Sequence, residues 1–184
     1  ILYPSAAVGQ QKGVAFGAST FNVKPPTGGT QSWTSITGAL SLSSRLEAGV
    51  TYLRRSGGGT LDGVGAFGKW QLRPEGLALP AVSAGANVIG GDLRTQEYYL
   101  VASKQILPKA TKHPLTLTGG LMQVDYRDGL KRSGLDFFGG ADLTLTGKFS
   151  LVAEYRSRTR FNLRDSSGAM VMYRGKTYGV GVGF

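Results

Sequence analysis

The feature of this chain that most constrains its fold is an alternation of apolar residues with polar residues or glycine. The clearest case is segment 177–184, which reads T-Y-G-V-G-V-G-F. Successive side chains of a β-strand point to opposite faces, so the apolar residues here share one face and glycines almost fill the other. The same period of two recurs along the chain, and no apolar period near 3.6 residues persists. The sequence therefore predicts an all-β fold.

About ten such strands are predicted, with eight as the alternative. All of them fall within one domain, 13–184, and residues 1–12 are expected to form an N-terminal segment in the periplasm. The glycine content, 29 of 184 residues, suits a curved and closely packed sheet. The predicted strand ranges are 13–21, 32–42, 45–55, 60–73, 80–89, 95–106, 114–126, 134–146, 149–158 and 171–184.

The predicted connections alternate in length. Tight turns are expected at 43–44 and 147–148, and intermediate connections at 74–79 and 107–113. The remaining connections are longer, polar and rich in glycine. With ten strands, all the shorter connections lie on the same side as both ends of the chain, as in outer-membrane barrels with short periplasmic turns. We therefore predict an antiparallel, up-and-down transmembrane β-barrel. The long connections are 22–31, 56–59, 127–133 and 159–170.

Composition excludes several classes of protein. No apolar run approaches the ~18–20 residues of a spanning helix. Cysteine is absent, which excludes a disulfide or a thiolate metal site, and we expect no cofactor. The formal charge of +10 could attract nucleic acid, anionic lipid or small anions. Because the basic residues are scattered, we expect no nucleic-acid partner. The start of the chain lacks the features of a signal peptide, so an exported protein would be in its mature form here.

The apolar face of the predicted strands carries aromatic residues near both ends. Membrane barrels place such residues in girdles at the two lipid–water interfaces. The predicted girdle residues are Trp33, Tyr52, Tyr98, Tyr126 and Tyr155 towards the long connections, with Trp70 and Phe184 towards the short ones.

The opposite face carries both acidic and basic residues, and we predict that it lines the lumen. These charges could form an ion path. They could instead form a network of ion pairs that fills a narrow barrel, because poorly hydrated charges need partners. The alternative is a soluble β-sandwich whose charged face contacts water. The predicted aromatic girdles argue against this alternative. The predicted lumen network is Glu47, Lys69, Arg73, Glu97, Asp136, Asp142, Glu154, Arg156 and Arg158.

The ending of the chain resembles that of Gram-negative outer-membrane β-barrel proteins. Those proteins commonly end in a strand of alternating apolar residues with a terminal Phe, and segment 178–184, Y-G-V-G-V-G-F, is similar. The resemblance implies a multi-pass barrel in the bacterial outer membrane. It also implies recognition by the barrel-insertion machinery, with an insertion signal formed by Tyr178, Val180, Val182 and Phe184.

A second resemblance covers about residues 80–160. The segments 80–85 (P-A-V-S-A-G), 97–104 (E-Y-Y-L-V-A-S-K) and 149–155 (F-S-L-V-A-E-Y) resemble barrel repeats of YjbH-type outer-membrane proteins. That family is associated with exopolysaccharide export and has much longer chains. We take this resemblance to bear on the fold alone.

Three motifs could carry chemistry. The segment 63–68, G-V-G-A-F-G, matches the dinucleotide fingerprint in letters, but no helix pattern or matching acidic residue follows it. His113 could be a general base; in its turn-like setting, a surface position is the simpler interpretation. Asp142 and Glu154 could be a catalytic carboxylate pair or ordinary partners of basic groups. We therefore predict no catalytic residues.

Arginines near the predicted outer rim could bind phosphates of lipopolysaccharide, or could be solvated charges. The functional hypothesis from sequence is a small passive channel or a structural membrane protein. One alternative is an anchor or assembly partner for other envelope proteins. Another is a lipid-modifying enzyme of the outer membrane. The rim arginines are Arg54, Arg55, Arg156, Arg158, Arg160 and Arg164.

Overall fold

The computed structural model describes residues 13–23, 30–57, 59–107, 113–126, 132–146, 149–164 and 170–183. At some strand ends, and throughout 158–164 and 170–183, it describes the backbone alone. These ranges hold ten strands and no helix, hence no helix that could cross a membrane. The strands are β1 (Val14–Val23), β2 (Gln31–Ser41), β3 (Leu46–Ser56), β4 (Leu61–Arg73), β5 (Ala81–Gly91), β6 (Thr95–Leu107), β7 (Leu115–Tyr126), β8 (Arg132–Thr146), β9 (Phe149–Arg164) and β10 (Met170–Gly183).

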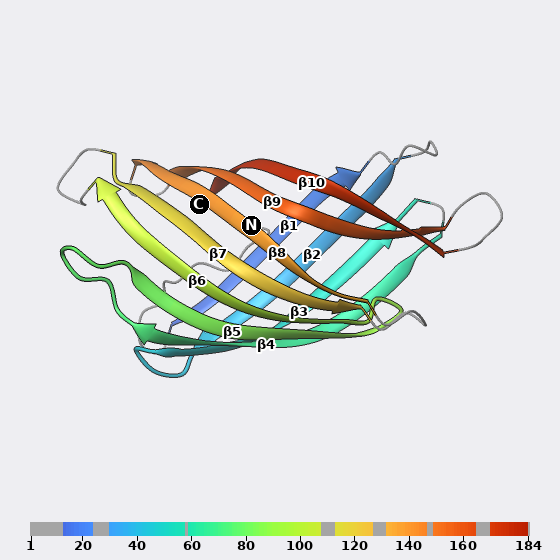
Figure 1. Ribbon diagram of the computed structural model, residues 1–184, viewed down its shortest axis with the longest axis horizontal. Helices are drawn as coiled ribbons and strands as arrows, with labels where there is room; N and C mark the ends of the chain where they lie inside the picture. Colours follow the sequence, from blue (N-terminus) through green and yellow to red (C-terminus); the bar gives the residue numbers. More distant parts are fainter. Residues whose placement is uncertain are drawn as a thin grey trace.

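Each strand pairs antiparallel with its neighbour in sequence, so the sheet order runs from β1 to β10. The prediction of an all-β, antiparallel, up-and-down fold is confirmed. The sheet curls into a half-barrel (Figure 1). Among the described residues, no ladder joins the two edge strands, β1 and β10.

The connections between strands lie at two opposite ends of the curled sheet. We call the end where β1 begins and β10 finishes the turn end; it also carries the connections 42–45 and 74–80 (left in Figure 1). The opposite end, with the connections 57–60 and 92–94, is the loop end. Both β1 and β10 thus have their outer chain ends at the turn end. The described connections do not show the predicted difference in length, because 74–80 at the turn end is longer than 57–60 and 92–94 at the loop end.

β9 departs furthest from its predicted length. The sequence analysis ended this strand at residue 158 and predicted a loop over 159–170, but β9 continues to Arg164. Its last part, 159–164, pairs with 170–175 of β10, beyond the point where β8 stops pairing with β9. The prediction was wrong because it missed the alternation of Phe161 and Leu163 with polar residues. By register these two residues lie opposite Tyr173 and Val171.

The faces of the sheet are inverted relative to a soluble protein. The large apolar side chains of the strands that are exposed lie on the convex face, including Val50, Val64, Leu100 and Phe137. Several of the buried side chains are charged or polar and lie on the concave face. The alternation read from the sequence therefore separates an apolar outside from a mixed inside.

Aromatic rings on the concave face lie over glycines. In three hairpins, a ring covers the glycine directly opposite it on the preceding strand, so that a Cβ at that glycine would meet the ring. The absent side chain therefore lets the ring lie flat against the sheet, which stabilises a curved strand pair. The three pairs are Phe67 over Gly49 (β4 on β3), Tyr99 over Gly85 (β6 on β5) and Phe138 over Gly120 (β8 on β7).

Candidate functional site

The concave face holds the ionisable groups that could carry a function. The first pair joins β3 and β4, where Glu47 lies directly opposite Lys69. The Lys69 Nζ is 3.0 Å from Glu47 Oε1, and the two side chains are 8% and 14% exposed. Two charges this poorly hydrated are stable only as a pair.

A second group joins β8 and β9 to strands across the half-barrel. The Nε of Arg156 donates a hydrogen bond to Asp136 Oδ2 at 3.2 Å, and its Nη2 is also 3.2 Å from that oxygen. The same Nη2 is 3.9 Å from Glu97 Oε1. Glu97 Oε2 in turn accepts a hydrogen bond from Asn87 Nδ2 at 3.1 Å. Acidic and basic groups from β6, β8 and β9 therefore form one network.

This network depends on the curvature of the sheet. β6 and β9 are three strand spacings apart, roughly 14 Å along the sheet. Arg156 and Glu97 approach each other because the concave side brings side chains of distant strands together. Five of the predicted lumen residues lie on the concave face and take part in these two sets of ion pairs, namely Glu47, Lys69, Glu97, Asp136 and Arg156.

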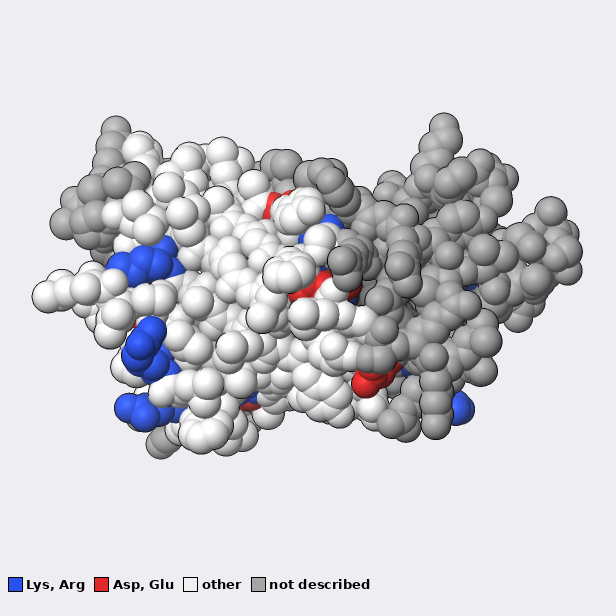
Figure 2. All heavy atoms as spheres, in the orientation of Figure 1, with Lys and Arg blue, Asp and Glu red and all other residues white. Residues whose placement is uncertain are grey.

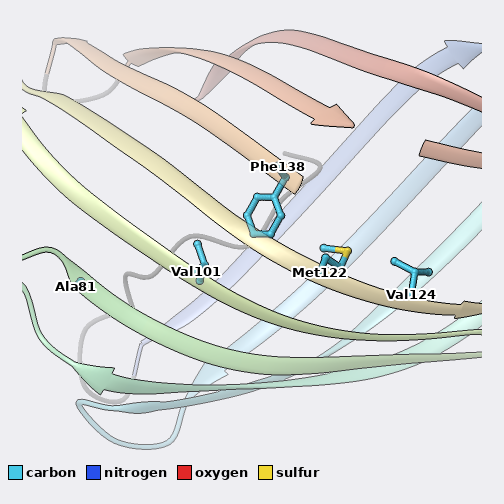
Figure 3. Close-up of a cluster of buried hydrophobic side chains, with 5 residues drawn as sticks. All are labelled: Ala81, Val101, Met122, Val124 and Phe138. Carbon is cyan, nitrogen blue, oxygen red and sulfur yellow. The ribbon is translucent and has the colours of Figure 1, made fainter. Parts of the chain in front are cut away.

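An apolar cluster lies beside the charges. Figure 3 shows Val101, Met122, Val124 and Phe138 on the inner side of β6, β7 and β8, together with Ala81 of β5. By register, Met122 lies opposite Asp136 and Phe138 lies opposite Arg156, so the cluster borders the ion pairs. Sequence reasoning missed this cluster because it took the whole inner face to be polar.

Arg73 does not belong to the network, contrary to the sequence prediction. A β-bulge between Gln71 and Arg73 shifts the register of β4 against β5. The extra residue turns the exposed Arg73 away from the face that Gln71 occupies. The Arg73 Nε instead donates a hydrogen bond to the carbonyl oxygen of Pro80 at 3.2 Å.

Trp33 and Arg55 also differ from their predicted positions. They lie opposite each other on β2 and β3 and on the concave face. The Arg55 guanidinium lies 5.9 Å from the centroid of the Trp33 ring, a cation–π contact. Arg55 is only 1% exposed, so it is not a solvated rim charge. Trp33 faces the interior and cannot contribute to a girdle on the convex face.

The other predicted lumen residues are less tightly placed. Asp142 and Glu154 are diagonal neighbours on the concave side of β8 and β9, opposite Val152 and Gly140 respectively. No ion pair among the described side chains includes Asp142. The side chain of Arg158 lies outside the described part.

Of the predicted girdle residues, several lie on the convex face. Trp70 is 58% exposed towards the turn end, and Tyr98 is exposed on β6. Tyr52 donates a hydrogen bond from its hydroxyl to Asp62 Oδ1 at 2.7 Å. Tyr155 lies opposite Gly139, in the same register as exposed Leu151 opposite Leu143.

The remaining girdle and insertion residues are only partly described. The side chain of Tyr126 and all of Phe184 fall outside the described residues. Tyr178, Val180 and Val182 have described backbones only, and they pair in register with Tyr155, Ala153 and Leu151.

The other motifs carry no site. The segment 63–68 runs inside β4, with strands paired on both sides and no helix following it, so it is not a dinucleotide loop. His113 is exposed in the connection before β7. Within the described ranges, no cluster of three or more His, Cys, Asp or Glu side chains could hold a metal ion. No protein-family profile, curated protein or solved structure matches the chain.

Proposed function

We propose that this chain is a small β-barrel of the bacterial outer membrane and acts there as a structural membrane protein. The observation that carries the proposal is the inverted polarity of the sheet. Apolar side chains such as Val50, Val64 and Phe137 stand exposed on the convex face, while Lys69 and Asp136 are buried inside. Lipid is the solvent that stabilises such an outside, as in barrels with alternating apolar-out and polar-in strands.

A soluble form of this sheet is unfavourable. Soluble monomers rarely expose contiguous apolar patches larger than a few hundred Å², and here exposed apolar residues occur on the convex side of every strand from β2 to β9. An open sheet edge is not tolerated in hydrocarbon. The proposal therefore includes pairing of β1 with β10 to close a ten-stranded barrel.

The interior favours a structural barrel over an open pore. Ion pairs and the apolar cluster pack beside one another on the concave side, where Asp136, Met122 and Phe138 are each at most 4% exposed. A channel is the second candidate, because the contact between Arg156 and Glu97, at 3.9 Å, is the longest in the network.

Conductance separates the two candidates. The folded protein in a planar bilayer is expected to show no discrete current steps, because the filled interior leaves no continuous water path. Insertion is verified separately by protection from protease. Discrete steps in the unmodified protein would favour the channel.

The membrane proposal is tested on the convex face. Val50 is 62% exposed near the middle of β3. Val50→Arg is expected to disfavour insertion into lipid vesicles by ~2–4 kcal/mol, because an arginine would face the bilayer midplane. The matched control is Thr60→Arg in the connection between β3 and β4, which should leave insertion unchanged. Equal insertion of both variants would contradict the proposal.

A further inference from the structure

The connection 74–80 between β4 and β5 is held in place at the turn end by β6. Lys104 Nζ donates hydrogen bonds to the carbonyl oxygens of Gly76 at 2.7 Å and Leu77 at 2.8 Å. It also lies 3.2 Å from Glu75 Oε1, which accepts a hydrogen bond from the backbone N–H of Gln105 at 2.9 Å. The backbone of the connection is thus ordered by side chains.

This ordered backbone directs apolar side chains outward. Leu77 is completely exposed and Leu79 is more than half exposed. At the same end of β4, Trp70 and Leu72 are exposed as well. Trp70 and Leu72 belong to the last part of β4. Leu77 and Leu79, in the connection that follows, add two more exposed apolar side chains after the end of that strand.

Two exposed arginines lie at the same end of the sheet as these apolar residues. Arg73 is exposed at the end of β4, and Arg45 is exposed beside it, its carbonyl oxygen accepting a hydrogen bond from the Gln71 N–H at 2.7 Å. In Figure 2, Lys and Arg side chains gather at the left, turn end of the visible face, while acidic as well as basic atoms are visible near its middle. Exposed leucines beside cations are typical of a surface that lies at the boundary of an anionic membrane.

We propose that the connection 74–80 inserts Leu77 and Leu79 into the headgroup boundary of an anionic phospholipid leaflet, with Arg45 and Arg73 at the phosphates. This inference rests on the proposed membrane function and adds the lipid chemistry that the turn end recognises. Two features identify lipid as the occupant. The leucines are exposed in the connection that follows exposed Trp70 and Leu72 of β4, and the neighbouring charges complement phosphate.

The experiment uses single cysteines, because the chain has none of its own. Leu77→Cys, Val50→Cys and Thr60→Cys are each labelled with an environment-sensitive fluorophore and folded into vesicles of phosphatidylcholine and phosphatidylglycerol. Nitroxide-labelled lipids then report depth. We expect quenching at Val50 by deep nitroxides, quenching at Leu77 by nitroxides near the headgroup end of the acyl chain, and no quenching at Thr60.

The outcomes distinguish this inference from the membrane proposal. A Leu77 probe that is unquenched and open to iodide, while Val50 is quenched, overturns the inference and leaves the membrane function standing. If the Val50 probe is also unquenched, the result contradicts the proposed membrane function itself.

The role of charge is tested by lipid composition. Quenching at Leu77 is expected to rise as phosphatidylglycerol is added, and this rise should be lost in the Arg45→Gln/Arg73→Gln background. Quenching that is independent of phosphatidylglycerol in both backgrounds overturns the assignment to anionic lipid.

Discussion

Glu47 and Lys69 illustrate, at the scale of the residue, what a charge needs inside this sheet. Each is mostly buried, and each lies directly opposite its partner across one strand pair. Removal of one member leaves the other charged and poorly hydrated, which costs more than the pair itself contributes.

We therefore expect Lys69→Met to lower the free energy of unfolding by about 3–5 kcal/mol. The double variant Lys69→Met/Glu47→Gln should recover much of this loss, because no charge is left without its partner. Urea unfolding of the protein folded in vesicles measures both. Equal losses in the single and double variants would show that the pair contributes through packing and not through charge.

Packing between neighbouring strands is tested at Gly85, which lies under the ring of Tyr99. A Cβ at this position would meet the Cζ and hydroxyl oxygen of Tyr99 and would lie 2.6 Å from the carbonyl oxygen of Gly68. Gly85→Ala is therefore expected to cost about 1–3 kcal/mol. Gly68→Ala is the matched control, because nothing lies within 4 Å of a Cβ there. A similar cost for both variants in the same unfolding assay would contradict the packing argument.

At the scale of the strand, the sequence predicted the buried and exposed residues best where the two faces of a strand differ in polarity. In β8, exposed Leu135 and Phe137 alternate with buried Asp136 and Phe138, as the pattern indicates. In β7 both faces carry apolar residues, since Leu117 and Leu121 are exposed while Met122 and Val124 are buried. The alternation in polarity is therefore weak along β7, although β7 pairs with β8 in unbroken register.

The errors in strand geometry have separate causes. The position of Arg73 depends on a bulge that composition does not reveal. Trp33 was placed by its residue type, although the alternation with Ile36 and Leu40 on β2 puts it on the other face. The contact of Arg156 with Glu97 depends on curvature, which pairing between neighbours does not determine.

At the scale of the whole molecule, the edges β1 and β10 decide how the sheet is completed. Because the chain has no cysteine of its own, only introduced cysteines can form a disulfide in a cross-linking test. We expect Ala18→Cys on β1 to form a disulfide within the same chain with a cysteine at one of the positions 177–182 on β10, because closure removes both edges from lipid. Disulfides that link two chains would instead show that the barrel is completed by a second copy.

The neighbour-by-neighbour order of the strands has a consequence for how such a protein can evolve. Three successive hairpins, β3–β4, β5–β6 and β7–β8, each carry their own inner ring over a glycine. Duplication or loss of one hairpin changes the number of strands by two. Such a change keeps the inner and outer faces of the sheet as they are and leaves both chain ends at the same end of the sheet. The width of the sheet can therefore change during evolution by one hairpin at a time.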